Sequence, residues 1–581
     1  MRYRALACDY DGTLAADGRV APQTLAALEQ LRASGRQLLL ATGRELDDLI
    51  AVFPHVSLFD RVVAENGAVL YHPAQQETRL LSAPAPEALI RALRARGVAP
   101  LSTGRVIVAT WQPQETVVLE VIRELGLELQ VTFNKGAVMV LPAGVTKATG
   151  LAAALRDLGL SPHNIVGVGD AENDHAFLHL CECAAAVANA LPAVRDGADL
   201  ITRAANGAGV VELIERLLAT DLSEVAPRLS RHHLLLGTRE DGQEVRVSPW
   251  GGPLLLAGTS GSGKSTLATG FLERLVEAGY QCCILDPEGD YDAFEGAVIL
   301  GDQQRAPTVA EALRLLEPPE QHVVVNLLGV PLEERPAFFT GLFARLQELG
   351  AQTGRPHWIV ADEAHHLLPA AWQPPAPTLT PMLTGLLLIT VHPDQVVPTA
   401  LAAVDLVVAV GASPECTLAS FSHALGQRPP AMAPVALEPG EALVWRWRVE
   451  PLPSRLRSEA GRTERRRHQR KYAAGELGPD KSFYFRGPQG ALNLRAQNLM
   501  LFLQLADGVD DATWLYHLRQ GDYSRWFREA IKDEALAAEA AQIETCGELS
   551  PRESRAQIRA AITQRYSLPT TPPVGGAATW S

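Results

Sequence analysis

Two sets of residues in this chain have the types and the spacing that phosphate chemistry requires. The first set begins with Asp9-Tyr10-Asp11-Gly12-Thr13 directly after an apolar run, and it continues with Thr42 and Lys147. The second set begins with a glycine-rich loop that ends in Lys264-Ser265, and Asp362-Glu363 follows it along the chain. Paired carboxylates beside a lysine suit attack on a phosphate ester, whereas a glycine-rich loop before a helix suits binding of a nucleoside triphosphate.

The first set predicts a phosphomonoester hydrolase that works through an aspartyl-phosphate. Asp9 and Asp11 are two positions apart, so an extended chain points both carboxylates the same way. One carboxylate can attack phosphorus while the other protonates the leaving oxygen. Thr42 can hydrogen-bond a phosphoryl oxygen, and Lys147 can neutralise charge on the nucleophile and the phosphate.

A later acidic stretch adds a metal site to this chemistry. Asp170 and Asp174 would complete a Mg²⁺ site with Asp9, because hard carboxylate oxygens suit that cation. Together with Glu65-Asn66-Gly67-Ala68, these motifs resemble the Cof-like branch of the haloacid dehalogenase superfamily, and the resemblance extends over residues 1–220.

That resemblance implies roles for individual residues. Asp9 would be the nucleophile and Asp11 the general acid and base, and an acid at position 11 implies a phosphatase, which is favoured, or a phosphomutase. The implied magnesium ligands are Asp9, the Asp11 backbone carbonyl and Asp170, with Asp174 in support. Contacts with phosphate or substrate are expected from Gly43, Arg44 and Asn173. The short cap favours a small phosphorylated metabolite, such as phosphoglycolate or a sugar phosphate.

The second set predicts ATP binding and hydrolysis. An apolar run precedes the loop and a helical pattern follows it, which is the setting that a phosphate-binding loop needs. Lys264 would reach the β and γ phosphates, and Ser265 would ligate Mg²⁺. Asp362 would hold Mg²⁺ through water, and Glu363 would polarise the attacking water. The nucleotide-binding residues are expected to be Gly258, Thr259, Ser260, Gly261, Ser262, Gly263, Lys264, Ser265 and Thr266.

Three further stretches resemble the HerA/FtsK superfamily of DNA-pumping ATPases. They are Asp286-Pro287-Glu288-Gly289-Asp290-Tyr291, then Asp362-Glu363-Ala364-His365, and the polar strand tip Thr390-Val391-His392, a candidate sensor. This resemblance covers about residues 253–425, and it implies double-stranded DNA as a partner and a homo-oligomeric ring. Arg428 is the candidate arginine finger. The adjacent His365 and His366 are interpreted as loop or sensor residues rather than as metal ligands.

The elements that must position these residues predict a multidomain α/β protein. Residues 1–220 alternate strand-like and helical runs, as in a Rossmann-like doubly wound domain, and a small α/β cap interrupts them at about 84–142. A P-loop NTPase α/β domain is expected at 230–452 and a C-terminal helical domain at 473–566. A basic linker at 453–472 and a disordered tail at 567–581 complete the predicted order.

Two segments near the C-terminus allow more than one interpretation. The stretch 455–471 carries eight Arg and Lys against two Glu, so it is either a solvated linker, the favoured interpretation, or a track for a phosphate backbone. The aromatic residues of 473–566 are interpreted as a helical core rather than as a platform for stacked bases, because several fall at helical spacing.

Bulk properties limit the function classes. The formal net charge of −14 argues against a protein that nucleic acid coats by charge alone. No cysteine pair has zinc-ligand spacing and no signal peptide is visible, so we expect a cytoplasmic protein. The longest apolar run, near residues 383–391, is about half of a membrane span, so no membrane partner is expected.

Three functions remain open for the whole chain. The first is a bifunctional enzyme that joins a Mg²⁺-dependent phosphatase to a HerA-like ATPase. The second is a nucleic-acid end-healing enzyme of the polynucleotide kinase/phosphatase type, although Glu363 beside Asp362 favours activation of water over phosphorylation of a hydroxyl. The third is a metabolite phosphatase with a regulatory nucleotide switch.

Overall fold

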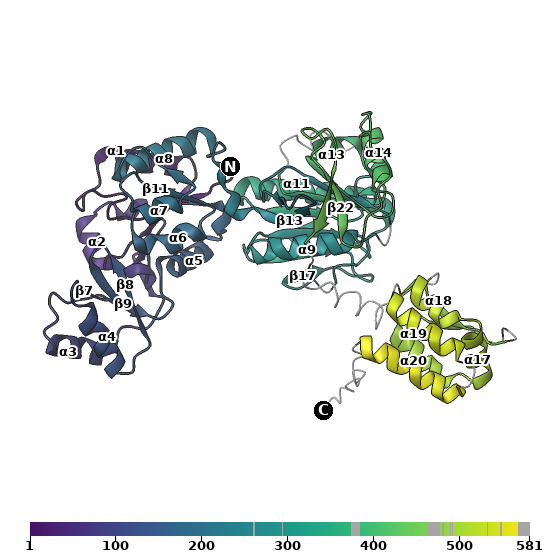
Figure 1. Cartoon of the computed structure of the whole chain (residues 1–581). Helices are drawn as coiled ribbons and strands as arrows, with labels where there is room; N and C mark the ends of the chain where they lie inside the picture. Colours follow the sequence, from purple (N-terminus) through teal and green to yellow (C-terminus); the bar gives the residue numbers. More distant parts are fainter. Residues whose placement is uncertain are drawn as a thin grey trace, which may run out of the picture. The chain divides into compact units, whose positions relative to one another are not determined.

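The computed structural model divides the chain into two compact units, residues 1–459 and 460–581, which are considered separately (Figure 1). The residues that it describes are 1–259, 262–292, 294–372, 384–459, 461, 477–478, 481–488, 490, 492–531, 533–546 and 549–566. Arg465, Arg466 and Arg467 of the basic stretch and the tail 567–581 lie outside these residues.

The first sheet of the first unit has eight strands in the order β12-β11-β10-β1-β2-β3-β4-β5. Its central strand β1 (Ala5–Cys8) pairs in parallel with β2 (Gln37–Ala41) on one side and with β10 (Ile165–Gly169) on the other. All four residues of β1 are buried, as expected for a strand that is covered on both faces. The remaining strands are β3 (Arg61–Ala64), β4 (Val69–His72), β5 (Glu77–Leu80), β11 (Cys183–Ala186) and β12 (Leu200–Ile201).

Helices α1 (Pro22–Ala33), α5 (Lys147–Leu158) and α8 (Asn206–Thr220) pack against this sheet and contribute to its core. One of them, α5, has clear signals at both ends. Thr146 caps the N-terminus of α5 through a reciprocal capping box with Thr149, and Gly159 ends the helix in a left-handed conformation. The cap on α5 fixes the position of Lys147, which is the first residue of the helix.

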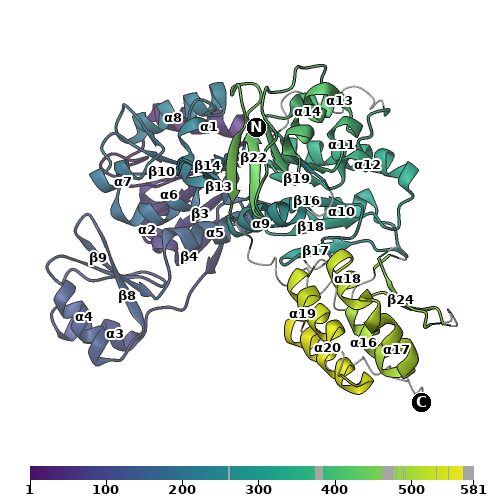
Figure 2. The same ribbon diagram turned by 45° about the vertical axis from the view of Figure 1, so that its right-hand side comes forward.

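The cap forms a lobe of its own, which Figures 1 and 2 both show beyond the end of the core sheet. Its strands form a four-stranded antiparallel sheet in the order β6-β7-β9-β8. Its small core is separate and includes Leu89, Leu93 and Val118. The elements follow the predicted order of helix, two strands, helix, two strands: α3 (Glu87–Ala95), β6 (Ser102–Thr103), β7 (Val108–Trp111), α4 (Glu115–Glu124), β8 (Leu129–Asn134) and β9 (Ala137–Pro142).

The second sheet has eleven strands in the order β14-β13-β23-β22-β21-β15-β20-β19-β16-β18-β17. Strands β15 to β21 run parallel, and the remaining four form an antiparallel extension. Their bounds are β13 (Leu234–Arg239), β14 (Glu244–Val247), β15 (Leu254–Gly258), β16 (Cys282–Asp286), β17 (Ala297–Leu300), β18 (His322–Asn326), β19 (Trp358–Ala361), β20 (Leu386–Thr390), β21 (Leu406–Val410), β22 (Glu441–Trp445) and β23 (Ser454–Ser458).

Both faces of this sheet are buried, which explains why its strands are continuously apolar. Leu254 and Leu256 of β15 face the core under α9 (Lys264–Glu277), whereas Leu255 and Ala257 face the core under α11 (Arg335–Thr353). Further helices of this part are α10 (Val309–Leu315), α12 (Ala364–Leu367), α13 (Pro398–Ala403) and α14 (Pro414–Ala424).

The end of this sheet differs from the expected boundary at residue 452. Strand β23 pairs with both β22 and β13, so the first residues of the expected linker belong to the sheet. Leu456 is buried whereas Arg457 is exposed and Arg455 is half-buried, which is the alternation of a strand with one solvated face. The many basic residues of this stretch favoured a linker, although its exposed and buried residues alternate as in a strand.

The second unit holds a hairpin and helices around an aromatic core. Phe483, Phe502, Trp514, Tyr523 and Phe527 belong to one buried cluster, so the interpretation of these aromatic residues as a core is confirmed. The elements are β24 (Phe483–Phe485), β25 (Leu494–Ala496), α16 (Leu499–Gly508), α17 (Asp511–Arg519), α18 (Asp522–Glu529), α19 (Glu534–Thr545) and α20 (Pro551–Arg565). Among the helices of the described residues, none is long and apolar enough to cross a membrane.

Candidate functional site

The first cluster of candidate residues lies where three parallel strands end. Asp9 follows β1, Thr42 follows β2 and Asp170 follows β10. Because β1 has β2 on one side and β10 on the other, the strand order reverses here, and such a switch point is where open α/β sheets bind ligands. These three side chains lie at one edge of the sheet because each follows one of three neighbouring parallel strands.

Lys147 forms ion pairs with both Asp9 and Asp174. Its Nζ donates to Asp9 Oδ1 at 2.5 Å and to Asp174 Oδ1 at 2.6 Å, and its side chain is 1% exposed. Burial alone would lower the pKa of Lys147, but the charges and hydrogen bonds of Asp174 and Asp9 raise it, so the lysine is charged. Burial and the nearby Asp174 charge raise the pKa of Asp9 to about 8, against the opposing effect of Lys147.

Asp174 organises the loop that carries Asp170. Its Oδ2 accepts hydrogen bonds from the backbone N–H groups of Asp170 and Ala171, at 2.8 and 2.9 Å. Its other oxygen holds Lys147. Asp9, Asp170 and Asp174 together form a group of buried carboxylates whose oxygens lie within 4.8 Å of one another. This donor set fits Mg²⁺, with Asp174 occupied mainly in holding its neighbours.

A lysine that the sequence analysis missed stands at this carboxylate group. Lys135 lies in the β8–β9 turn of the cap, and its Nζ donates to Asp170 Oδ2 at 2.6 Å and to the Asp11 carbonyl oxygen at 3.1 Å. These two oxygens are among the expected magnesium ligands, so an ammonium group is placed where a metal cation would bind. Thr13 donates to the other oxygen of Asp170 at 3.1 Å.

Asp11 and Arg44 form a pair that the sequence analysis did not expect. Arg44 Nε and Nη2 donate to the two oxygens of Asp11 at 2.6 and 2.7 Å, and Nη1 donates to Asp48 at 2.7 Å. The hydrogen bonds with Asp11 raise the pKa of Arg44 above its ordinary value, despite the opposing effect of burial. Both expected roles, Asp11 as acid and Arg44 as a substrate contact, therefore require this pair to open.

The other expected substrate contacts line the space between the core and the cap. Asn173 donates to Asn66 at 3.0 Å, and its Oδ1 is buried without a hydrogen-bond partner, which leaves an acceptor for a ligand. Gly43 lies against Asn173 and the cap residues Asn134 and Met139, since an added Cβ would meet all three within 4 Å. Thr42 is buried, and its hydroxyl accepts from the Arg44 amide at 3.1 Å.

Glu65 attaches the cap to the core. Its buried carboxylate accepts three consecutive backbone N–H groups of the cap, from Arg105, Val106 and Ile107, at 2.8 to 3.0 Å. The turn that presents it is left-handed at both Glu65 and Asn66 (φ 50° and 54°), a conformation that strained functional turns adopt. The Glu-Asn-Gly signal marked this turn, but only the structure shows its role as a clamp.

The glycine-rich loop also occupies its expected place, between β15 and α9. Lys264 is the first residue of α9, and its Nζ donates to the loop's own carbonyl oxygens, Gly258 at 2.8 Å and Thr259 at 3.0 Å. Burial lowers the pKa of Lys264, while Glu363 and Asp362 oppose this shift. Ser265 and Thr266 are half-buried in the first turn of the helix. Gly263 precedes that turn with a positive φ, and Ser260 and Gly261 lie outside the described residues.

Asp362 and Glu363 follow β19 on the same side of the sheet. Asp362 is buried, and desolvation together with the neighbouring Asp286 raises its pKa well above the ordinary value. Desolvation and the Glu288 charge raise the pKa of Glu363 to about 7, and its Oε2 is buried without a hydrogen-bond partner. The contact of this oxygen with His365 Nδ1, at 3.4 Å, is longer than an ordinary hydrogen bond.

The candidate sensor strand β20 lies between β15 and β19, so its tip separates the loop from Glu363. Thr390 at this tip is within 3.1 Å of His365 Nδ1, and the same nitrogen is 3.4 Å from Glu363. His365 therefore links the strand tip to the candidate base, as expected of a loop or sensor residue. Arg428 is exposed in the segment after α14.

The Asp286–Tyr291 stretch is a loop that folds around its first residue. Asp286 accepts backbone N–H groups from Glu288, Gly289 and Asp290 with one oxygen and from Tyr291 with the other, at 2.8 to 3.2 Å. This explains why an aspartate is needed at the end of β16. The loop brings Glu288 near enough to influence the Glu363 carboxyl.

Comparison with known proteins matches two parts of the chain to two families. Residues 6–99 and 113–214 match the haloacid dehalogenase-like hydrolase family, and residues 254–340 match the central domain of the helicase HerA. A phosphoglycolate phosphatase of Haloarcula marismortui is 34% identical over 219 residues, which are 36% of this chain and 95% of that protein. The corresponding enzyme of Halorubrum lacusprofundi is 33% identical over 207 residues, 34% of this chain and 89% of that protein.

A phosphoglycolate phosphatase of Methanothermobacter thermautotrophicus is 29% identical over 225 residues, 37% of this chain and 99% of that protein. The three relatives are matched over 89–99% of their own length, and the family match at 6–99 and 113–214 includes Asp9, Lys147 and Asp170. The chain therefore belongs to the haloacid dehalogenase-like hydrolases, and it joins a phosphatase of that family to a HerA-type domain.

Proposed function

We propose that residues 1–220 hydrolyse the phosphomonoester of a small anionic metabolite, such as phosphoglycolate, through an aspartyl-phosphate on Asp9. The observation that carries this proposal is the buried ion pair of Lys147 with Asp9 and Asp174, at 2.5 and 2.6 Å. It directs one carboxylate oxygen of Asp9 to the lysine and leaves the other for phosphorus. The names of the three relatives support phosphoglycolate as the first substrate to test.

The chemistry takes place in two steps. A free oxygen of Asp9 bonds to phosphorus while the bond from phosphorus to the leaving oxygen breaks, and Asp11 protonates that oxygen. Water then attacks the acyl-phosphate, Asp11 takes its proton, and phosphate departs. Mg²⁺ would be held by Asp9, the Asp11 carbonyl oxygen and Asp170, and when bound it supplies positive charge that keeps Asp9 ionised and neutralises the phosphate.

An anionic substrate fits the Asp11–Arg44 pair. A carboxylate with both oxygens on a guanidinium cannot carry the proton that the leaving oxygen needs. A substrate with a carboxylate or phosphate beside the scissile bond would draw Arg44 to itself and release Asp11. Asn173, with its unpaired Oδ1, would accept from a substrate hydroxyl or from protonated phosphate.

The test is Mg²⁺-dependent release of phosphate from phosphoglycolate and from a panel of sugar phosphates and neutral-alcohol phosphates. We expect turnover of the anionic substrates and its loss in Asp9→Asn. Arg44→Lys should raise KM more for phosphoglycolate than for an aryl phosphate that lacks a second anion. Equal effects on both substrates would reject the role of Arg44 in recognition, and activity retained by Asp9→Asn would reject the mechanism.

We further propose that the domain containing Lys264 hydrolyses ATP with Glu363 as the base. Support comes from the position of Glu363 directly after β19, from its buried Oε2 without a hydrogen-bond partner, from its raised pKa and from the match to the HerA central domain. Such a domain would act on double-stranded DNA as a homo-oligomeric ring, a hexamer in the simplest case, with Arg428 of one subunit reaching the nucleotide of the next. The alternatives are a kinase that transfers phosphate to a 5′-hydroxyl end and a nucleotide switch.

Three measurements separate these functions. A ring ATPase should elute as an oligomer, and its ATP turnover should rise with double-stranded DNA and fall again with salt. An end-healing kinase would label a 5′-hydroxyl oligonucleotide from γ-labelled ATP. A switch would bind ATP and change phosphatase activity without DNA stimulation or label transfer.

A further inference from the structure

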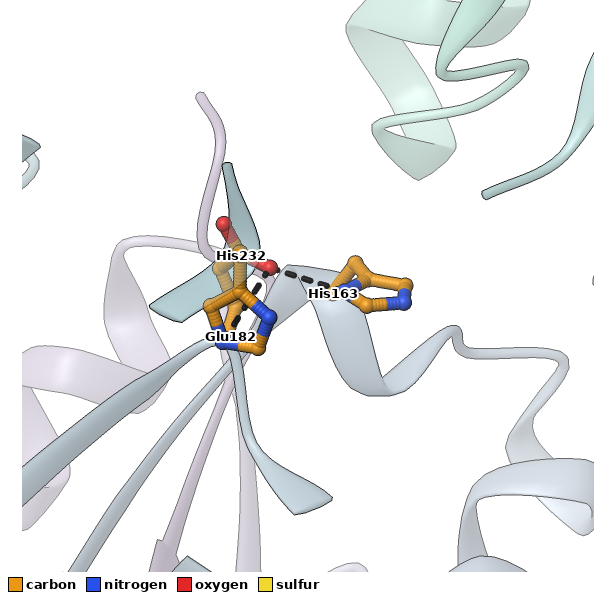
Figure 3. Close-up of side chains that lie close together, drawn as sticks. All are labelled: His163, Glu182 and His232. Atoms are coloured by element: carbon orange, nitrogen blue, oxygen red, sulfur yellow. Dashed lines mark hydrogen bonds and ion pairs between the residues drawn. The ribbon is translucent and has the colours of Figure 1, made fainter. Parts of the chain in front are cut away.

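A second cluster with metal-ligand chemistry lies away from both catalytic sites. His163, Glu182 and His232 present one ring nitrogen, one carboxylate oxygen and one ring nitrogen, all within 4.8 Å of one another (Figure 3). They come from three separate segments: the 3₁₀ turn Pro162–Asn164, the residue before β11, and the 3₁₀ turn Ser230–His232. Neither the haloacid dehalogenase chemistry nor ATP hydrolysis uses these residues.

The distances in the cluster fit a shared ion. His163 Nδ1 is 2.7 Å from Glu182 Oε2, and His232 Nε2 is 3.8 Å from the same oxygen. Donor atoms around a tetrahedral Zn²⁺, with bonds of about 2.0–2.2 Å, lie roughly 3.4 Å apart, between these two values. Glu182 is fully buried, and the side chains of His163 and His232 are 8% and 14% exposed.

Two ring nitrogens in this cluster lack a satisfactory hydrogen-bond arrangement without a cation. His232 Nε2 is buried and has no hydrogen-bond partner. His163 has an acceptor at each nitrogen, because Nδ1 is 2.7 Å from Glu182 Oε2 and Nε2 is 2.7 Å from the Ala278 carbonyl oxygen. A neutral imidazole has one N–H and can satisfy only one of these acceptors. The ring is therefore either an imidazolium or a ligand that binds a cation through Nδ1.

Neighbouring groups orient His163 and Glu182 through hydrogen bonds, as is usual for metal ligands. The Nε2–H of His163 can donate to Ala278, which fixes the tautomer that exposes the Nδ1 lone pair. Arg2 donates to Glu182 Oε1 at 2.5 Å, and the Tyr280 hydroxyl donates to Oε2 at 2.9 Å. One lone pair of Oε2 remains for an ion. Tyr280 also stacks on the His163 ring, with centroids 3.7 Å apart.

We propose that His163 Nδ1, Glu182 Oε2 and His232 Nε2 bind one transition-metal ion, with Zn²⁺ as the best match to two imidazoles and one carboxylate. The fourth position is left to water, because the three side chains supply three donors. The ion would join the phosphatase core to the HerA-type domain, because His163 and Glu182 belong to the part with the first sheet and His232 lies just before β13 of the second sheet.

Cobalt binding by the full-length chain tests this site. The protein is stripped with a chelator, excess Mg²⁺ is added to fill the all-oxygen sites, and Co²⁺ is then titrated. Four-coordinate Co²⁺ with nitrogen ligands absorbs visible light strongly, whereas six-coordinate Co²⁺ on oxygen absorbs weakly. We expect one strongly absorbing Co²⁺ per chain, which Zn²⁺ displaces stoichiometrically.

Three variants localise the ion. His232→Ala and Glu182→Gln should each weaken Co²⁺ binding by about tenfold or more, because each removes a ligand. His233→Ala is the matched control, since it changes the adjacent histidine and should leave the titration unchanged. Phosphatase activity with Mg²⁺ and the circular dichroism spectrum verify that each variant is folded.

The outcomes decide whether this cluster binds a metal ion or holds His163 as an imidazolium. A titration in which wild type and a folded His232→Ala coincide would overturn the proposal and leave His163 as an imidazolium paired with Glu182. The same holds if Co²⁺ absorbs only weakly in the presence of Mg²⁺. If Glu182→Gln does not fold, His232→Ala alone carries the decision, because His232 makes no hydrogen bond through the proposed ligand atom.

Discussion

The two phosphate sites of this chain use a lysine in opposite ways. Lys147 is enclosed by two carboxylates of its own domain, so this lysine has charged partners before any ligand arrives. Lys264 instead donates to two backbone carbonyl groups of its own loop, and Oε2 of Glu363 is buried without a hydrogen-bond partner. The first site is organised by internal ion pairs, whereas the second is organised to exchange weak internal contacts for those of a nucleotide.

The largest effect is expected where the phosphatase site does covalent chemistry. Asp9→Asn should lower phosphoglycolate hydrolysis on the order of 10³-fold or more, because an amide cannot form the acyl-phosphate. ATP turnover measured on the same preparation should stay within a factor of two (~0.4 kcal/mol) of the original chain. A parallel fall in both activities would show that the two sites are not chemically separate.

The lysine comparison can be tested as a difference in stability. Lys147→Met should destabilise the folded chain by about 3–5 kcal/mol, because it leaves Asp9 and Asp174 buried without their cation. Lys264→Met should cost about 1 kcal/mol or less, because two neutral backbone carbonyl groups lose a donor and no paired carboxylate loses its cation. Melting curves in the absence of nucleotide measure both. Similar losses would contradict the contrast between the two sites.

If Glu363 activates water, a substitution there should separate ATP binding from ATP hydrolysis. Glu363→Gln should lower ATP turnover by about 10²-fold, a typical contribution of a general base, while ATP still raises the melting temperature as in the original chain. Asp302→Asn, an acid on a surface turn beyond β17, is the control and should change neither quantity. Loss of the thermal shift in Glu363→Gln would mean that the residue binds nucleotide rather than activating water.

The smallest effect concerns the cap lysine. Lys135→Ala removes an ammonium group from Asp170 and the Asp11 carbonyl, so Mg²⁺ should bind tighter by about tenfold or less, a range we take from ordinary charge-pair energies. Calorimetric titration of Mg²⁺ into the substrate-free protein measures this without relying on turnover. Lys135→Arg, which keeps the charge, should resemble the original chain, and unchanged affinity in Lys135→Ala would remove the lysine from the metal site.

The sequence predicts the location of candidate catalytic residues where a local pattern marks them. Asp9, Thr42 and Asp170 each end an apolar run, and parallel strands bring such ends to one edge. Sequence reasoning missed Lys135 and the pairing of Asp11 with Arg44, because these contacts depend on how the cap closes and on which side chain reaches a shared space. Lys135 is 124 positions from Asp11 along the chain. Nothing local marks it.

The same limit explains the boundary at β23 and the histidine cluster. Leu456 between Arg455 and Arg457 follows a strand period, but a high local charge favoured a linker. Three strands and three α-helices lie between His163 and His232 along the chain, and only the fold shows that both reach Glu182. Metal sites built from single residues of distant segments leave no spacing signature, unlike the glycine-rich loop.

The Glu65 clamp has a mechanical consequence. Three successive amides between β6 and β7 of the cap bind one carboxylate of the core, so we expect the cap to turn about its contact with Glu65. The chain leaves the cap at the end of β9 and reaches Thr146 and Lys147 after few residues. A rotation that lets product escape therefore pulls on the segment that carries the catalytic ammonium group. One movement of the cap would then both release phosphate and return Lys147 to its position beside Asp9.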